Sequence, residues 1–345
     1  MMVQASVLER PPARLAFVVP FLGRWPRWAE LFFLSLRANS SVHVLIFCES
    51  SPPFSLPPNA FVFETSRSAM VERLRRATGL PLEEISGHKL CDFKPFYGLC
   101  FSDYLASYEF WGFCDVDLMF GDLEKLLRSS LMAEVDVFTA HDTRIVGHFT
   151  ILRNNDLVNR IGFEIQDWRS MCLDPQTMQV DELFFQGALE AHPEIRWGRP
   201  ASLPVELESP FCRFGITFGF AGEVAHLESK LPALVEWRSG RVFYSDTGGT
   251  ESEVLYLHFM GLKRWWHWLS FGPGRGSHSS HRFSRIGYGG PTRVLRLARF
   301  PWKQVYELES FLQATKTLFG SFSRNLLPGR VFLRLRRFVF GKGRY

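Results

Sequence analysis

Short apolar runs separated by polar turns organise the first part of the chain. Residues 15–21 and 42–48 are almost entirely apolar, as in strands buried on both faces of a sheet, and residues 29–38 between them suit a buried helix. A third apolar run at 60–63 precedes a charged helix, which we expect over 69–77. Strands that alternate with helices in this way predict a parallel α/β sheet.

The rest of the sequence mixes strand and helix patterns with irregular segments. A helix with Pro95 in its first turn is expected from about 95 to 106, and an amphipathic helix is expected to begin at Asp181. Short segments between 196 and 246 that are rich in Pro, Gly and aromatic residues predict small antiparallel strands and loops. Further strands, the second of them half-buried, are predicted at 135–140, 147–154 and 253–259.

The central stretch runs from Phe110 to Asp122 and is apolar on both sides of Asp115 and Asp117. An ionised carboxylate buried without a partner is strongly destabilising, so these two acids require a strand end, a cation or both. Positions two apart on a strand point the same way, and we expect the two carboxylates to project together. They would form half of a site for a hard divalent cation such as Mg²⁺ or Mn²⁺. The alternative is a pair of strand-end carboxylates satisfied by backbone amides or a nearby arginine.

Two other polar groups are candidates for a site. Asp92 and Lys94 lie just before the helix expected at 95–106, where a lysine can meet a phosphate or a carboxylate. The alternative is that Asp92 caps this helix and Lys94 is solvated. Asp181 and Glu182 lie in the first turn of their helix, where the helix dipole alone would favour negative charge.

Composition excludes several classes of protein. A chain of 345 residues with 46% hydrophobic content can bury a sizeable core and is not disordered. The six Cys include no Cys-x-x-Cys pair, so a zinc or disulfide framework is not expected. Glycine-rich dinucleotide and P-loop motifs are absent from the sequence. The first residues lack the basic and apolar regions of a signal peptide, and we expect a cytoplasmic protein.

Several motifs in this order resemble GT-A type glycosyltransferases, and most closely bacterial GT-A-like proteins associated with surface-polysaccharide synthesis. The motifs are Cys91-Asp-Phe-Lys-Pro95, Phe110-Trp-Gly-Phe-Cys-Asp-Val-Asp117, Gly121-Asp122, Gly147-His-Phe-Thr150 with Arg153-Asn154, and His258-Phe-Met-Gly-Leu-Lys-Arg-Trp265. The last is similar to the ending of galactosyltransferases and glycogenin-like enzymes, although Lys263 follows Gly261 more closely here. The resemblance covers roughly residues 15–265 and implies a GT-A-like catalytic domain, which we place at 15–269, with a Rossmann-type mixed sheet flanked by helices. The charge of residues 270–345 predicts a separate basic helical tail.

The resemblance also implies a role for each candidate residue. Asp115, Asp117 and His258 would hold the metal, for which a mixed set of imidazole and carboxylates favours Mn²⁺ over Mg²⁺. Donor contacts would come from Asp92, Lys94, Asp115, His148 and Lys263. Asp181 or Glu182 would face the reacting sugar, as general base if the reaction inverts; retention needs a base less, and both outcomes stay open.

The expected activity is that of a hexosyltransferase in surface-polysaccharide synthesis. It would use a nucleoside-diphosphate sugar, a UDP-sugar being favoured, and a saccharide or lipid-linked saccharide acceptor. One alternative is a metal-dependent nucleotidyltransferase or phosphohydrolase, which also holds diphosphates with paired Asp and a cation. Another is a non-catalytic carbohydrate-binding protein on a GT-A scaffold, with aromatic residues at 211–220 and 265–268 stacking on sugars. Three metal ligands in one chain argue against the last.

Charge is distributed unevenly along the chain. The net charge is +5, yet residues 270–345 carry 15 Lys and Arg against only two acidic residues. As helices, residues 293–300 and 330–340 would turn basic and apolar side chains toward one anionic surface. Because the interleaved residues are aliphatic or Phe, we expect peripheral attachment to a membrane and not binding of nucleic acid. The resemblance implies the inner membrane face, where the lipid-linked acceptors of surface-polysaccharide enzymes lie. The alternative is a basic helix pair folded back on the acidic body.

Overall fold

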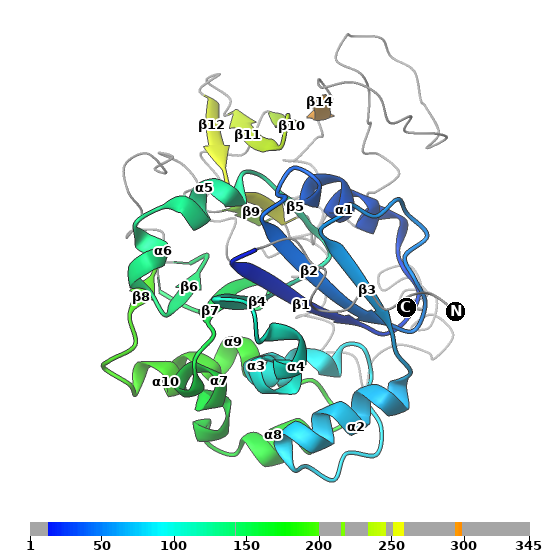
Figure 1. Cartoon of the computed structure of the whole chain (residues 1–345), viewed down its shortest axis with the longest axis vertical. Coiled ribbons are helices and arrows are strands. Elements are labelled where there is room, and N and C mark those ends of the chain that lie inside the picture. Colours follow the sequence, from blue (N-terminus) through cyan, green and yellow to red (C-terminus); the bar gives the residue numbers. More distant parts are fainter. Residues whose placement is uncertain are drawn as a thin grey trace, which may run out of the picture.

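A seven-stranded mixed sheet forms the centre of the computed structural model, which describes residues 13–141, 143–199, 215–217, 234–245, 251–258 and 294–298. In sheet order the strands are β3 (Ala60–Glu64), β2 (Val42–Cys48), β1 (Leu15–Phe21), β4 (Phe110–Cys114), β7 (Phe149–Arg153), β6 (Val137–Thr139) and β8 (Trp197–Gly198) (Figure 1). The first four are parallel, and β7 is antiparallel to both of its neighbours. The predicted α/β class with a mixed sheet is therefore confirmed.

Helices cover both faces of this sheet (Figure 1). One face carries α1 (Glu30–Leu36), α5 (Leu123–Arg128) and α6 (Leu131–Glu134). The other carries α2 (Arg67–Thr78), α3 (Tyr97–Cys100), α4 (Ser102–Leu105), α7 (Asp156–Arg160), α8 (Trp168–Leu173), α9 (Val180–Leu183) and α10 (Phe185–Glu190). Three 3₁₀ segments, η2 (Arg27–Ala29), η3 (Lys89–Phe96) and η4 (Ile161–Glu164), complete the described helical structure.

Strand β1 shows how the apolar pattern builds two cores. Ala16 and Val18 pack into the core on the α2 face, whereas Leu15, Phe17 and Val19 pack into the core on the α1 face. Successive side chains of a strand point to opposite faces, so a strand covered on both sides must be apolar at every position. The continuous apolar runs at 15–21 and 42–48 have this cause.

Two sequence predictions need correction, one for a helix beside the central sheet and one for a strand within it. The helix expected from 95 to 106 is instead η3 followed by the short helices α3 and α4. Pro95 lies inside η3 and has no N–H to donate, which disfavours a regular α-helix there. The strand at 147–154 is β7, and it is buried and not half-buried, because β4 and β6 flank it and helices cover both faces.

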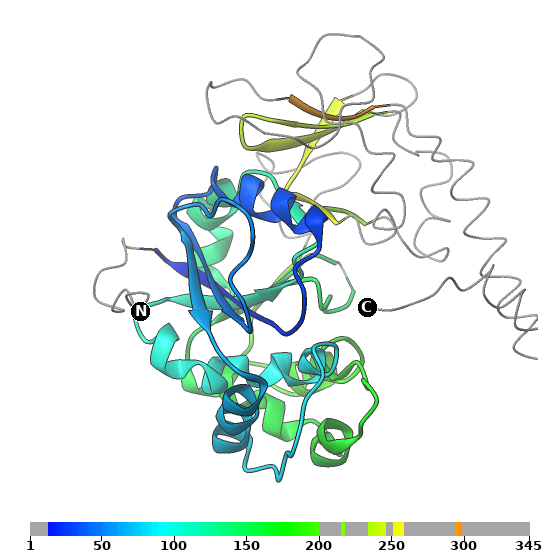
Figure 2. The same cartoon turned by 90° about the vertical axis from the view of Figure 1, so that its right-hand side faces the viewer.

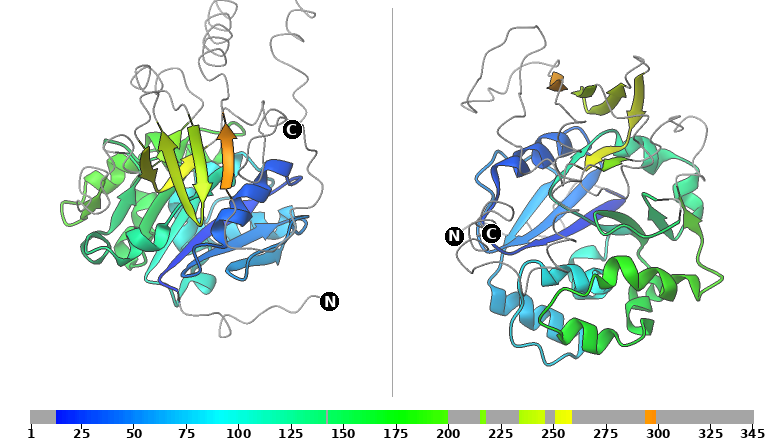
Figure 3. Two further views of the ribbon diagram at one scale, coloured as in Figure 1. Left: turned by 90° about the horizontal axis from the view of Figure 1, so that it is seen from above. Right: turned by 180° about the vertical axis from the view of Figure 1, so that it is seen from behind.

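Two smaller sheets lie on the α1 side of the central sheet (Figure 2). One contains β5 (Leu118–Phe120), β13 (Tyr256–His258) and β9 (Gly215–Thr217). The other contains β12 (Glu251–Val254), β11 (Arg241–Ser245), β10 (Leu234–Arg238) and β14 (Val294–Ala298), seen from above in Figure 3. The indole of Trp237 in β10 donates a hydrogen bond to the carbonyl of Phe120, which links the two.

The pairing of β14 corrects the helix that we expected over residues 293–300. Residues 294–298 form a strand antiparallel to β10, so part of the basic region contributes to a sheet. The second basic segment, 330–340, lies outside the described residues, and the domain boundary at 269/270 stays a prediction. Among the described residues, no helix is both long and apolar enough to cross a membrane.

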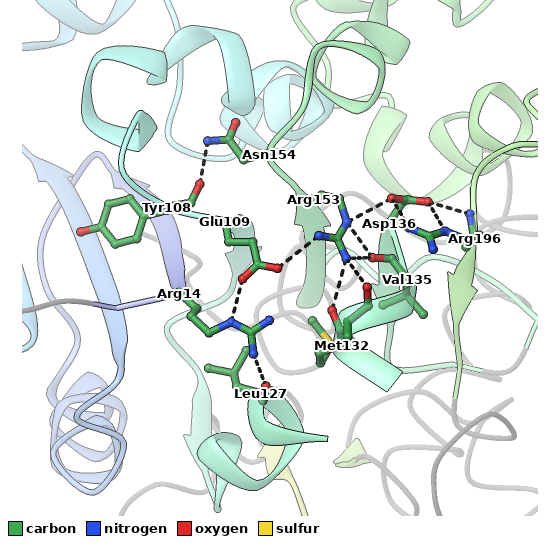
Figure 4. Close-up of polar contacts among 11 residues, drawn as sticks. Arg14, Tyr108, Glu109, Leu127, Met132, Val135, Asp136, Arg153, Asn154 and Arg196 are labelled. Carbon is green, nitrogen blue, oxygen red and sulfur yellow. Dashed lines mark hydrogen bonds and ion pairs between the residues drawn. The ribbon is translucent and has the colours of Figure 1, made fainter. Parts of the chain in front are cut away.

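A network of ion pairs joins the strands at the edge where β1 and β4 begin (Figure 4). Glu109 accepts from Arg14 and from Arg153, and Asp136 pairs with Arg153 and Arg196 at 3.1 Å. Register places all of these groups at the edge opposite to the carboxyl end of β4. The network, which we call the far-edge network, is thus remote from the candidate site.

Candidate functional site

The turn that follows β4 carries both central acids. β4 ends at Cys114, and Asp115 and Asp117 lie between it and β5. A turn, and not the alternation of a strand, therefore brings them together. The side chain of Asp117 is only 3% exposed, whereas that of Asp115 is 40% exposed. This end of β4 lies beside β1, where the strand order reverses, and ligands of open α/β sheets bind at such points.

Strand pairing brings His258 to the same place from far along the chain. β13 runs antiparallel to β5 with His258 opposite Leu118, the residue that follows Asp117. The Nε2 atom of His258 lies 3.4 Å from Oδ2 of Asp117. Among the described residues, Asp115, Asp117 and His258 form a group with one ligand atom each within 4.8 Å of one another.

These three residues, the metal cluster, fit a divalent cation. The His258 side chain is buried, yet neither ring nitrogen has a hydrogen-bond partner among the described residues. Buried polar atoms are nearly always paired, and a bound ion is one partner that would satisfy a ring nitrogen of His258. Two carboxylates and a histidine nitrogen are the donors that Mn²⁺ or Mg²⁺ would take, with imidazole favouring the former. The cluster is therefore able to bind a metal, as predicted.

Side chains from α1 and from the turn after it hold the strand that follows the two acids. The amide of Phe120 donates to Ser35 Oγ at 2.9 Å. Asn39 donates to the carbonyl of Gly121 and accepts from the amide of Leu123, both at 2.8 Å. Because Ser35 and Asn39 are fully buried, these bonds keep β5, and with it β13, in a defined place.

His148 lies against the metal cluster. Its ring stacks on that of His258 with centroids 4.2 Å apart, and its Nε2 shares a hydrogen bond of 2.9 Å with the hydroxyl of Tyr256. Burial lowers the pKa of His148 well below its usual value, and repulsion from His258 adds to this effect. His148 is accordingly a neutral imidazole at physiological pH.

Lys94 connects the metal cluster to the acids of α9. Its ammonium donates to the carbonyl of Gly147 at 2.8 Å and lies 3.2 Å from both Asp115 Oδ1 and Asp181 Oδ2. Burial opposes its charge, but the attraction of Asp115 and other neighbours outweighs this and raises the pKa of Lys94 well above its usual value. The predicted contact between Lys94 and a carboxylate is thus present.

Asp181 and Glu182, which we call the acid pair, pack against Gly147. Burial raises the pKa of Asp181 to about 6, with Lys94 opposing the rise and Glu182 adding to it. Glu182 Oε1 accepts a hydrogen bond from the amide of Gly147 at 2.9 Å. A Cβ atom on Gly147 would lie 2.4 Å from Asp181 Oδ2, so only glycine leaves room for this approach. The helix dipole is therefore not the whole reason for two acids at this position.

Asp92 differs from its predicted role in donor binding. It is fully buried and accepts hydrogen bonds from the amides of Met178 and Val180 and from the ammonium of Lys89. Both carboxylate oxygens are thus occupied by the protein itself. Asp92 supports the segment that leads into α9, and it neither caps the expected helix nor presents an oxygen to a ligand.

Lys263 and the aromatic residues at 265–268 lie outside the described residues. Their predicted contacts with a diphosphate or a sugar stay predictions. Of the 211–220 segment, only Gly215–Thr217 is described, as strand β9.

Residues 17–266 match a protein family described as a family of unknown function, DUF6625. The chain belongs to the DUF6625 family. The DUF6625 match includes the metal cluster, Lys94 and the acid pair. No curated protein matches the chain.

Several solved structures of glycosyltransferases are weakly similar to this DUF6625 protein. The galactosyltransferase LgtC, in complex with donor and acceptor sugar analogs, is 12% identical over 72% of this chain and 87% of its own, with a TM-score of 0.36. Mouse xyloside xylosyltransferase 1 is 10% identical over 72% of this chain and 98% of its own, with a TM-score of 0.37. GlyE of Streptococcus pneumoniae TIGR4 is 13% identical over 55% of this chain and 45% of its own, with a TM-score of 0.32. At these scores the likeness carries no argument about activity.

Sequence reasoning overlooked three residues of the DUF6625 site. Lys89 was missed although its spacing of three from Asp92 places the two side chains on one side of a 3₁₀ segment. Gly147 was noted only as part of a motif, and Tyr256 was noted only as part of a strand. Their roles depend on contacts with segments distant in sequence, and the local sequence pattern does not predict such contacts.

Proposed function

We propose that this DUF6625 protein is a metal-dependent glycosyltransferase that moves a hexosyl group from a nucleoside-diphosphate sugar, with a UDP-sugar favoured, to a saccharide or lipid-linked saccharide acceptor. The observation that carries the proposal is the meeting of Asp115, Asp117 and His258 at the strand-order reversal of an α/β sheet. The motif resemblance described above, which includes these three residues, also supports it.

The protein's own residues supply a reason for each part of this chemistry. Transfer from a nucleoside diphosphate builds negative charge on the leaving diphosphate, and a divalent cation bound at the metal cluster would neutralise that charge. Lys94 remains protonated and adds a fixed positive charge beside Asp115. His148 stays neutral and stacks on the ring of His258, which restricts where the nitrogens of His258 can lie.

The acid pair would serve the acceptor. With its pKa at about 6, Asp181 is ionised at neutral pH and can accept a proton from an acceptor hydroxyl. Glu182 is anchored to the amide of Gly147, which restricts where its carboxylate can lie. A group that acts as a base must be held within hydrogen-bond reach of the acceptor, and both contacts favour such a fixed position.

A screen of nucleoside-diphosphate sugars tests the proposal. We expect one donor to raise the melting temperature in Mn²⁺ and not in EDTA, and we expect the protein to turn over that donor when a saccharide acceptor is present. Asp117→Asn should abolish turnover. The matched control is Asp122→Asn, because Asp122 lies five residues later and caps α5 through the amide of Lys125.

Two results would count against the proposal. Equal donor consumption with and without acceptor would favour a nucleotidyltransferase or phosphohydrolase. Sugar binding that is indifferent to Mn²⁺ and to Asp117→Asn, with no turnover, would favour a carbohydrate-binding protein.

A further inference from the structure

The buried carboxylate of Asp92 is bonded to backbone that lies far from it in sequence. Its Oδ2 accepts from the amide of Met178 at 2.8 Å, and its Oδ1 accepts from the amide of Val180 at 3.1 Å. Val180 is the first residue of α9, the helix that carries the acid pair. Asp92 therefore binds the backbone immediately before Asp181.

Helix α9 has no cap of its own. Its N-cap residue, Gln179, lies in the left-handed region with φ 55° and makes no side-chain capping bond. The first amides of a helix have no partner within the helix, and leaving such a donor buried and unpaired is destabilising. A left-handed conformation is also unfavourable for a residue other than glycine. Asp92 supplies the missing acceptors, so it holds the entry to α9 in a conformation that the local sequence does not favour.

Lys89 binds the same carboxylate and the segment before α9. Its ammonium lies 2.7 Å from Asp92 Oδ2 and donates to the carbonyls of Met171 and Gln176. Met171 belongs to α8, and Gln176 lies in the loop between α8 and α9. Only 7% of the Lys89 side chain and none of the Asp92 side chain is exposed, so the two charges neutralise each other within the protein. The pair ties the whole α8–α9 connection to η3.

The segment η3 also contacts a side chain of the acid pair directly. Lys94 lies in η3, two residues after Asp92, and contacts Asp181 Oδ2. η3 thus holds α9 at two points. Asp92 binds the backbone amide of Val180, and Lys94 contacts the carboxylate of Asp181. Two independent attachments from one segment define both the position and the direction of the acid pair.

We propose that Asp92, together with Lys89, is a positioning residue that places Asp181 and Glu182 for the reaction. The inference rests on the proposed function, because it assigns the acid pair to the acceptor side of a glycosyl transfer. The hydrogen bonds of the Asp92 carboxylate are with Lys89 and with the backbone before α9, and not with the metal cluster. Its removal would act through α9 and leave Asp115, Asp117 and His258 in place.

Hydrogen exchange on the full chain tests the positioning directly. Asp92→Asn keeps the side-chain volume but leaves Lys89 without its counter-ion, and we expect the amides of residues 176–184 to exchange at least about ten-fold faster than in the wild type. The matched control is Asp136→Asn in the far-edge network, where a carboxylate also pairs with arginines and accepts a backbone amide. This control should lower stability and leave exchange at 176–184 unchanged.

Kinetics separate positioning from a general loss of stability. We expect Asp92→Asn to lower kcat by about 10- to 100-fold, the size of effect that a small misplacement causes, with the donor KM within about two-fold of wild type. Asp136→Asn should keep both values when the two variants are compared at equal folded fraction. Should Asp92→Asn fail to fold, Lys89→Gln, which keeps the acceptors for α9, should give the same pattern more weakly.

Each outcome supports or overturns the positioning role. Unchanged exchange at residues 176–184 in both variants would overturn it, as would a kcat equal to that of Asp136→Asn. If the wild type turns over no nucleotide sugar, the proposed function fails, and the exchange rates still decide whether Asp92 holds α9.

Discussion

Exchanging Asp117 for Asn should change stability in opposite directions with and without metal. The ligand atoms of Asp117 and Asp115 lie within 4.8 Å of each other, and Asp117 is buried. Two unit charges at that separation repel by about 3.5 kcal/mol at an effective dielectric constant of about 20. The charge of Lys94, which lies 3.2 Å from Asp115 Oδ1, also attracts the nearby Asp117 and offsets part of this repulsion. We therefore expect the neutral amide to raise the free energy of unfolding of the metal-free protein by about 1 kcal/mol.

Added Mn²⁺ should reverse the order of the two proteins. A ligand at 100 times its Kd stabilises the folded state by about 2.7 kcal/mol. If Asp117→Asn weakens the metal about 100-fold, the same concentration adds only about 0.4 kcal/mol to the variant. The wild type then becomes the more stable protein by about 1 kcal/mol, because the metal gain exceeds the relief of repulsion.

Urea denaturation in EDTA and across an Mn²⁺ titration measures the free energy of unfolding of both proteins without and with metal. Asp122→Asn should behave as the wild type in each, since Asn caps a helix about as well as Asp. The reasoning is refuted if Asp117→Asn is less stable than the wild type in EDTA, or if Mn²⁺ stabilises both proteins equally.

Four further expectations follow, three from the described contacts and one from the charge pattern of the sequence. His258→Ala reduces three protein ligands to two, so calorimetric titration with a nucleoside diphosphate present should show more than about ten-fold weaker Mn²⁺ binding; unchanged affinity would reduce it to an ordinary strand-end histidine. Gly147→Ala places a Cβ 2.4 Å from a carboxylate oxygen of the acid pair and should lower kcat about 100-fold with a nearly unchanged melting temperature, whereas a wild-type kcat would show that the pair moves freely. Arg153→Met breaks the far-edge network and should cost about 2–3 kcal/mol in urea denaturation without altering kcat; a loss of kcat at equal folded fraction would contradict the separation of the two edges. A chain ending at Gly329 keeps β14 but lacks the second basic segment, and it should lose flotation with anionic liposomes; equal recovery of both chains would exclude that segment as the membrane contact.

The first strands of the central sheet were predictable because burial on both faces requires a continuous apolar run. β1 and β2 agree with the predicted runs at 15–21 and 42–48 for this reason. The metal cluster was predictable from motif order, since two acids in an apolar frame and a histidine at a strand end are rare in a core. The route by which they meet was not, because it depends on a turn after β4 and on the register of β13 against β5.

The support for the acid pair could not be predicted. Asp92 appeared to be a helix cap or a donor contact, because a local pattern registers only neighbours within a few residues. Its actual partners, Met178 and Val180, are set by the packing of α9 on η3. The strand β14 was mistaken for a helix because alternating Arg and aliphatic residues suit either structure until a partner strand is known.

The pairing of β13 with β5 has a consequence for the stage of synthesis at which the metal cluster is completed. All seven strands of the central sheet lie before residue 199, so this sheet can assemble on the ribosome while later residues are still being added. Asp115 and Asp117 are present in that intermediate, but His258 is added only some 60 residues after the sheet is complete. A nascent chain would therefore carry only two of the three candidate ligands, and the metal cluster would be complete only when β13 pairs with β5.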